Sequence, residues 1–176
     1  MVAAYIGLGS NTQQPVQQLQ AAVNALAALP NSQIAKISPI YTGPFIGGDP
    51  KKAHAEVFNA VLLLNTALEP EELLTALQAI EQQQGRVRKE VYSDRTIDLD
   101  LLIYANEQRD TTVLQLPHPR MQTRAFVMRP LCDIAAELVL PTGLSVYELY
   151  ASLVVDDLIK TPHILDIPTQ SFQSAL

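Results

Sequence analysis

The 176-residue sequence contains one cysteine and no tryptophan, and what it lacks excludes several classes of protein. The lone thiol, Cys132, cannot form an intrachain disulfide and leaves no cysteine cluster for zinc, which fits a reducing compartment. We expect Cys132 to lie in the core. No apolar run approaches the roughly 18 residues that a membrane span needs, and the N-terminus lacks the basic leader of a secretory signal. The sequence therefore predicts a soluble, cytoplasmic protein.

Charged residues are also scarce. They make up 17% of the chain against 48% for hydrophobic residues, so charge-driven disorder is excluded for the body of the chain. At roughly 150 residues per domain, the length predicts a single domain, which we expect to span residues 1–160. The tail, residues 161–176, shows no helical or strand period, and the sequence does not indicate its role.

The positive charges that are present lie mostly in one segment. Residues 86–129 hold eight of the twelve Lys and Arg against six acidic residues, whereas the rest of the chain has a net charge of −8. A protein that is acidic over most of its surface is repelled by DNA and RNA. The distribution therefore favours a small anionic ligand and no nucleic acid partner.

Hydrophobic periodicity predicts the order strand, helix, strand, strand, helix, strand. The expected strands are 2–8, 33–41, 58–64 and 97–104, and the expected helices are 15–29 and 70–84. This order is typical of the ferredoxin-like α+β sandwich, in which both helices cover one face of an antiparallel sheet. Further short helices are expected at 126–135 and 146–153, and a short strand at 112–116.

Glycine and proline mark the expected breaks in this pattern. Pro39 indicates an edge or a bulge in the second strand, and residues 42–55 predict a Gly/Pro loop. The segment from Gly7 to Asn11 lacks the Gly-Lys-Ser/Thr ending of a phosphate-binding loop. We therefore interpret it as a tight turn between strand and helix.

Two carboxylates stand two residues apart inside an apolar strand. Strand geometry sends Asp98 and Asp100 to the same face, with Cα atoms ~6.5 Å apart. At that separation two negative charges repel each other by roughly 3 kcal/mol at an effective dielectric of 20, so the site needs cations. Mg²⁺, which takes one or two carboxylates and completes its shell with phosphate oxygens, fits this pair best. A strand whose polar face simply meets water is the alternative.

Basic residues around this pair favour the metal interpretation. Arg86 and Arg88 follow the second expected helix, and Arg95 lies three residues before Asp98. Guanidinium groups bind phosphate oxygens bidentately. Arginines followed by a carboxylate pair therefore predict a site for a metal-bound polyphosphate. His118 lies between two prolines, in a rigid loop that would suit a hydrogen bond to a nucleotide.

Three stretches of the chain together resemble the 6-hydroxymethyl-7,8-dihydropterin pyrophosphokinase family. They are Tyr5-Ile6-Gly7-Leu8-Gly9-Ser10-Asn11, Ile80-Glu81-Gln82-Gln83-Gln84-Gly85-Arg86-Val87-Arg88, and Arg95-Thr96-Ile97-Asp98-Leu99-Asp100-Leu101-Leu102, the last followed by Pro117-His118 and Arg124-Ala125-Phe126. Their order and separations match the family over roughly residues 1–155. The resemblance implies the ferredoxin-like fold and transfer of the β,γ-diphosphate of ATP to the pterin hydroxymethyl group, with release of AMP, in folate biosynthesis.

The resemblance also implies roles for individual residues. Asp98 and Asp100 would hold two Mg²⁺ ions, and Arg86 and Arg95 would brace the transferring group. The remaining ATP-binding residues would be Gln78, Arg88, His118 and Arg124, and the pterin would be held by Gly43, Pro44, Ile46, Asn59, Tyr92 and Phe126. The expected partners are the two small-molecule substrates alone, and the expected state is a monomer.

The chain departs from the family pattern mainly in the segment before Arg95. Tyr92 stands where a Trp or Phe is common, and the segment reads one residue shorter. Val57 and Pro119 also replace residues that are often aromatic. Three other functions are compatible with parts of the sequence: an RNA-recognition module with the same element order, another two-metal nucleotide transferase, and an inactive paralogue that binds pterin. Formation of AMP from ATP and the reduced pterin would separate them.

Overall fold

The computed structural model describes the chain except for residues 13, 45–55, 86–96, 156 and 170–176. Its main sheet is antiparallel, with the strand order β5-β1-β4-β3-β8, and β2 also pairs with β4. The strands of this sheet are β1 Val2–Ser10, β2 Ser32–Ile37, β3 Tyr41–Pro44, β4 Glu56–Thr66, β5 Asp98–Tyr104 and β8 Ile159–Lys160. The helices are α1 Pro15–Ala27, α2 Pro70–Gln83, α3 Ala125–Ala135 and α4 Val146–Ala151, with a short 3₁₀ turn at Met121–Thr123.

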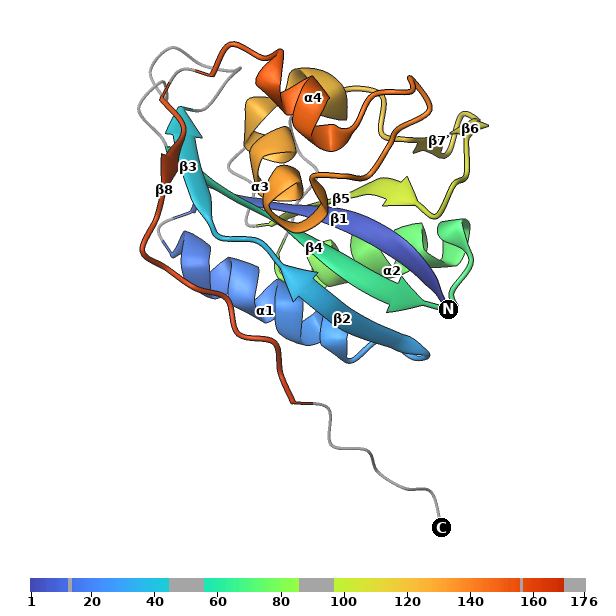
Figure 1. Cartoon of the computed structure of the whole chain (residues 1–176). Helices are drawn as coiled ribbons and strands as arrows, with labels where there is room; N and C mark the ends of the chain where they lie inside the picture. Colours follow the sequence, from blue (N-terminus) through green and yellow to red (C-terminus); the bar gives the residue numbers. More distant parts are fainter. Residues whose placement is uncertain (13, 45–55, 86–96, 156, 170–176) are drawn as a thin grey trace.

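The two faces of the sheet are covered by different helices (Figure 1). Along β1, Ala4, Ile6 and Leu8 are buried on the side where α1 and α2 pack. The opposite face carries a second core, in which Val61 and Leu102 of the sheet join residues of α3 and α4. The expected ferredoxin-like α+β sandwich is confirmed, and its extra C-terminal helices form a third layer. Cys132, on α3, is partly buried against this second core.

The expected strand 33–41 is wrong in one respect, because it is two strands. β2 ends at Ile37 and β3 begins at Tyr41, and both pair with β4. Between them, Ser38 replaces the ladder: its backbone N–H donates to the carbonyl of Val61 at 2.9 Å, and its hydroxyl accepts the N–H of Val61 at 2.9 Å. Pro39 has no N–H to continue the pairing. The chain therefore shifts sideways here, as the proline suggested.

Three further expectations need correction. Residues 42–44 belong to β3 rather than to a loop. Gly7 to Ser10 are the last residues of β1, not a turn, because Gly9 pairs with Asn59 of β4 and with Asp98 of β5. Of the expected strand 112–116, only β7 Gln115–Leu116 is a strand, and it pairs with β6 Arg109–Asp110.

The described part of the C-terminal tail packs against the sandwich. β8, which pairs with β3, directly precedes the tail. Within the tail, the N–H of Thr161 donates to the carbonyl of Ile40 at 2.9 Å, and Leu165 is 6% exposed within the core under α1. The side chain of Gln20, on α1, donates to the carbonyl of Asp166 at 2.9 Å and accepts the N–H of Asp166 at 2.8 Å. The division at residue 160 stays a prediction. In the described residues, no helix has both the length and the apolar character needed to cross a membrane.

Truncation of Leu165 tests how far the tail contributes to stability. We expect Leu165→Ala to lower the free energy of unfolding by about 2 kcal/mol, because a buried leucine loses its packing and leaves a cavity. Ile164→Ala is the matched control: its side chain is 80% exposed, so its effect should stay within about 0.5 kcal/mol. Urea denaturation measures both values. Equal effects would show that residue 165 is not held in the core in solution.

Candidate active site

A row of three residues crosses the sheet at the end of β1. Asn59 of β4 lies opposite Gly9 of β1, and Gly9 lies opposite Asp98 of β5. A Cβ at Gly9 would lie 3.2 Å from Oδ1 of Asn59 and 4.0 Å from Cβ of Asp98. Gly9 has no side chain. The amide oxygen of Asn59 and the side chain of Asp98 therefore lie on the same face of the sheet, with only the backbone of β1 between them.

Asp100 extends this surface by one row. It lies opposite Gly7 in β1. Both aspartates are half-buried. Leu99, between them, is only 5% exposed and belongs to the core under α1 and α2. The side chains of Asp98 and Asp100 therefore project to the α3 side of the sheet, as their spacing predicts. A Cβ at Gly7 would meet Leu102 at 3.4 Å, an ordinary contact.

The chemistry of these donors fits Mg²⁺. Carboxylate oxygens are the hard ligands that Mg²⁺ takes, usually one or two of them together with substrate phosphates. Glycine on the neighbouring strand leaves backbone, rather than a side chain, beside both carboxylates. Among the described residues, no group of three or more His, Cys, Asp or Glu side chains could hold a metal. A pair of carboxylates is the protein share of ligands that Mg²⁺ commonly takes when it also binds substrate phosphates.

His118 lies beside the carboxylate pair. Its backbone N–H donates to the carbonyl of Leu102 on β5 at 2.8 Å, and its Nδ1 accepts the N–H of Arg120 at 3.3 Å. Burial lowers the pKa of His118, and this effect outweighs the opposing charge of Asp100. The nearby Arg124 lowers the pKa further. The neutral ring, with Nδ1 as acceptor, carries its proton on Nε2.

Arg124 and Phe126 come together at the start of α3. Arg124 is the residue before the first turn, and its guanidinium carbon lies 5.6 Å from the centre of the Phe126 ring. Phe126 packs against the core that includes Val61 and Leu102. Val61 lies two residues after Asn59 on β4, and Leu102 lies two residues after Asp100 on β5. Side chains two residues apart share a face of a strand, so the Phe126 ring lies on the same face of the sheet as Asn59 and Asp100.

The other expected site residues lie elsewhere or outside the described residues. Gln78 is half-buried on α2, on the opposite side of the sheet from Asp98. Gly43 is on β3, where an added Cβ would meet Leu158 at 3.4 Å, and Pro44 ends that strand. Ile46, Arg86, Arg88, Tyr92 and Arg95 lie outside the described residues, so their roles stay predictions.

A network that the sequence analysis missed joins α3 to β3. The hydroxyl of Tyr41 donates to Oδ2 of Asp133 at 2.6 Å, and Nε of Arg129 donates to that hydroxyl at 3.0 Å. The Arg129 guanidinium also lies over the rings of Tyr41 and Tyr150, at 5.6 and 5.5 Å. Burial and Asp133 raise the pKa of Tyr41. Since Tyr41 pairs with Asn59, this network fixes the strand beside the site.

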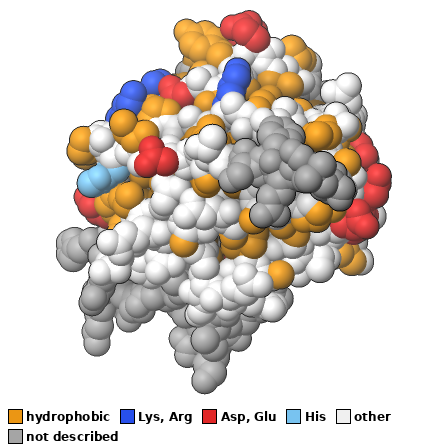
Figure 2. All heavy atoms as spheres, turned by 90° about the horizontal axis from the view of Figure 1, so that it is seen from below, with side chains coloured by type: hydrophobic (Ala, Val, Ile, Leu, Met, Phe, Trp, Pro, Cys, Tyr) orange, Lys and Arg blue, Asp and Glu red, His pale blue; other side chains and the backbone are white. Residues whose placement is uncertain are grey.

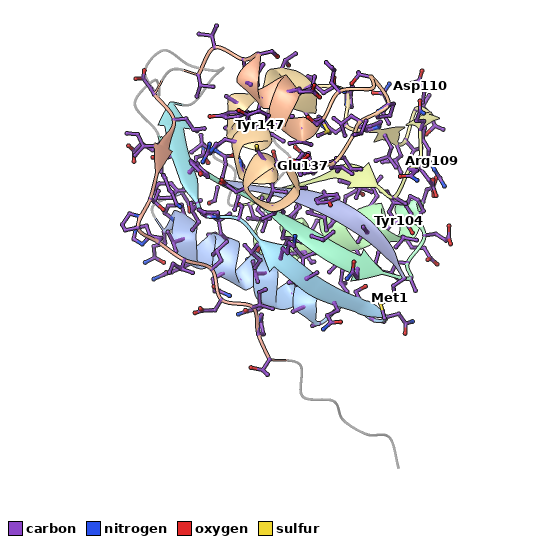
Figure 3. The ribbon with its side chains drawn as sticks, viewed as in Figure 1. Met1, Tyr104, Arg109, Asp110, Glu137 and Tyr147 are labelled. Atoms are coloured by element: carbon purple, nitrogen blue, oxygen red, sulfur yellow. The ribbon has the colours of Figure 1, made fainter. Side chains whose placement is uncertain are left out.

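Arginine at the other end of the sheet serves a different purpose. Figure 3 shows Arg109 and Asp110 near Tyr104, on the side of the molecule where Met1 lies. Arg109 forms ion pairs with Glu107, at 2.6 Å, and with Glu71. Tyr104 ends β5 and Asp98 begins it. Arg109 is therefore a surface link between α2 and the β6–β7 hairpin, remote from the carboxylate pair.

The surface and the layering argue against the RNA-recognition alternative. Such modules stack bases on an open sheet face, whereas here α3 and α4 cover the face opposite α1 and α2. Phe58, an aromatic residue of β4, packs against the other core. On the side of the molecule seen in Figure 2, the basic side chains of the described residues lie in the upper part of the view.

An α+β sandwich that presents paired carboxylates beside a neutral histidine and an arginine suits the class of enzymes that transfer phosphate-containing groups. The family model of 7,8-dihydro-6-hydroxymethylpterin-pyrophosphokinase (HPPK) matches residues 5–136. The chain belongs to this family, as its sequence motifs predicted.

Relatives of similar length agree with this assignment. A protein of Pseudomonas aeruginosa named 2-amino-4-hydroxy-6-hydroxymethyldihydropteridine pyrophosphokinase is 40% identical over 90% of this chain and 96% of its own. The protein of the same name from Haemophilus influenzae is 41% identical over 91% and 98%.

Solved structures show the same fold. A crystal structure of an HPPK-DHPS in complex with substrates matches with a TM-score of 0.68 and 14% identity. It covers 86% of this chain, which spans only 43% of that longer one. A Plasmodium falciparum HPPK-DHPS with SDX-DHP matches with a TM-score of 0.67 at 14% identity.

Titration of His118 tests its environment in the metal-free protein. Its lowered pKa should give an NMR midpoint below the ~6.5 of an unperturbed histidine. The unfolded chain then binds this proton first as pH falls, so the contribution of His118 to stability decreases below about pH 6.5. The urea-unfolded protein is the control. A folded-state midpoint at or above that of the unfolded chain would contradict the buried position.

Proposed function

We propose that the surface formed by Asn59, Gly9, Asp98 and Asp100 is the active site of this pyrophosphokinase. The enzyme transfers the diphosphate of ATP to the hydroxymethyl group of 6-hydroxymethyl-7,8-dihydropterin in folate biosynthesis. The single observation that carries the site is the row across β4, β1 and β5, in which Gly9 places no side chain between Oδ1 of Asn59 and the side chain of Asp98. The row places the amide of Asn59, which would bind the pterin ring, beside the aspartates, which would bind the metal and phosphates.

The two aspartates are the residues that would hold Mg²⁺, two ions in all. When bound, the ions supply positive charge that neutralises the phosphates and stabilises the charge that develops during transfer. The contribution of the chain is to aim both carboxylates to one face. It does so through the alternation of β5 and through the fixed pairing of Asp98 and Asp100 with two glycines.

His118 and Arg124 serve the nucleotide side. A neutral His118 with its proton on Nε2 donates one hydrogen bond to a phosphate oxygen, and Arg124 adds a charge-assisted one. We propose that Gln78, Arg86, Arg88 and Arg95 complete the ATP site. For these four residues the support is the family's motif, and for His118 and Arg124 it is also their position beside the carboxylate pair.

The pterin side is built around the amide of Asn59. Nδ2 of Asn59 donates to the carbonyl of Val57 at 3.2 Å, and this bond turns Oδ1 towards Gly9. An oxygen held in this way accepts a hydrogen bond from an N–H group of the pterin ring. We propose that Phe126 stacks on the ring from α3, that Tyr92 stacks from the other side, and that the backbone of Gly43, Pro44 and Ile46 closes one edge.

Product analysis tests the function directly. Wild-type protein given ATP, Mg²⁺ and the reduced pterin should form AMP and the pterin diphosphate. Formation of pyrophosphate with a nucleotidylated product would instead favour another two-metal nucleotide transferase, and pterin binding without AMP would favour an inactive paralogue. The monomeric state and the cytoplasmic location expected from the sequence stay predictions.

Neutralising one aspartate tests the metal role. We expect Asp98→Asn and Asp100→Asn each to reduce kcat to below about a tenth of the wild-type value, because each removes a charged oxygen ligand. The fold should be retained, since asparagine keeps the size of the side chain. AMP release and the melting temperature are measured together. Activity above that level in both folded variants would contradict the assignment.

Adding one methyl group to β1 tests the Asn59–Gly9–Asp98 row. Gly9→Ala places a Cβ 3.2 Å from Oδ1 of Asn59, so the amide must move, and we expect pterin affinity to fall about tenfold, the effect of a misdirected hydrogen bond. Gly7→Ala, whose Cβ meets Leu102 at an ordinary 3.4 Å, is the matched control. Calorimetry with pterin and a non-hydrolysable ATP analogue measures both. Equal affinities would remove Asn59 from the pterin site.

A further inference from the structure

Glu81 is a buried carboxylate. It is 3% exposed, and on α2 it continues the series Leu73, Leu77, Glu81 at four-residue spacing, in which the two leucines are fully buried. A carboxylate buried without strong hydrogen bonds destabilises a protein. Glu81 also belongs to one of the three stretches by which the family is recognised, yet the functions assigned above leave it without a role.

The buried carboxylate accepts a hydrogen bond from the strand that carries the two aspartates. Oε1 of Glu81 lies 2.8 Å from the backbone nitrogen of Leu99, the residue between Asp98 and Asp100. In the order of the described strands, β5 is the last on its side of the sheet. Successive N–H groups of an edge strand point alternately to its neighbour and away from it. The N–H of Leu99 points away from β1, where a further strand would otherwise accept its hydrogen bond, and Glu81 accepts it instead.

Leu99 is consequently held at two points. Its side chain is buried in the core under α1 and α2, and its N–H is bound by a side chain of α2. These two contacts fix the rotation of β5 about its own axis at Leu99. Because neighbouring side chains point to opposite faces of a strand, the same rotation sets the direction of Asp98 and Asp100 on the far face.

We propose that Glu81 is a positioning residue for the Asp98–Asp100 pair, acting through the Leu99 N–H to aim both carboxylates at a divalent cation. This inference rests on the proposed metal role of the two aspartates. Glu81 is not a third ligand: it comes from the helix on the other side of the sheet, and no group of three metal-ligating side chains exists among the described residues.

Two substitutions at residue 81 separate the hydrogen bond from the charge. Glu81→Met keeps the length of the side chain and removes the acceptor, whereas Glu81→Gln keeps an acceptor oxygen and removes only the charge. Leu73→Ala is the control, because it disturbs the core side of the same helix two turns before Glu81 and leaves the hydrogen bond from Leu99 to Glu81 in place. All proteins are compared at a temperature where each is folded.

Two measurements are made on each protein. One is the affinity for Mn²⁺ in the presence of the α,β-methylene analogue of ATP, followed by electron paramagnetic resonance. The other is the hydrogen-exchange rate of the Leu99 amide in metal-free protein, followed by NMR. We expect Glu81→Met to lower Mn²⁺ affinity by about tenfold or more, as loss of a residue that orients ligands does, and to speed Leu99 exchange. Glu81→Gln should stay within about threefold, and Leu73→Ala within about twofold of the wild type.

Two results would overturn the proposal. One is wild-type Mn²⁺ affinity in Glu81→Met. The other is a loss of affinity in Glu81→Gln while the Leu99 amide stays protected, because the charge would then act on the ion directly. This second comparison decides the matter even when Glu81→Met does not fold. Failure of the proposed metal site itself is distinguishable, since wild-type protein with the ATP analogue would then bind no Mn²⁺ although its Leu99 amide is protected.

Discussion

The site depends on the absence of a side chain at Gly9 of β1. This strand lies between β4 and β5, so a side chain at that position would stand between Asn59 and Asp98. A Cβ there would lie 3.2 Å from Oδ1 of Asn59, while Ile6 and Leu8 anchor the same strand in the opposite core. The alternation of a β-strand thus lets one short segment hold the fold on one face and leave room for chemistry on the other.

The two layers of helices divide these tasks further. α1 and α2 bury the apolar face and fix the pairing of β1 with its neighbours, whereas α3 contributes Phe126 and, through Arg129 and Asp133, contacts Tyr41 of β3. Changes in the first layer are expected to act on stability. Glu81 is the exception, because this side chain of α2 accepts a hydrogen bond from the backbone of β5, the strand that carries Asp98 and Asp100.

Sequence patterns sufficed where the responsible interaction is local. Period-two alternation placed Asp98 and Asp100 on one face, and helical periodicity located α1 and α2. The misses involve partners distant in the chain: the pairing of Gly9 with both Asn59 and Asp98, the bond of Ser38 to Val61 that separates β2 from β3, and the burial of Leu165 in a stretch without periodicity. Glu81 did leave a signal, a charged residue at the next four-residue step after Leu73 and Leu77, but its partner could come only from the fold.

The charge state of His118 follows from the balance between burial and the aspartates. Burial and the arginines favour the neutral ring, and the aspartates are the neighbours that favour the imidazolium. A divalent ion held by Asp98 and Asp100 would offset those negative charges and so remove the influence that opposes burial. Before a nucleotide brings its own phosphate charges, the balance therefore favours the neutral ring, and because Nδ1 accepts the N–H of Arg120, the remaining proton lies on Nε2. In the proposed site, a ring in this state offers a phosphate oxygen one hydrogen-bond donor of fixed direction.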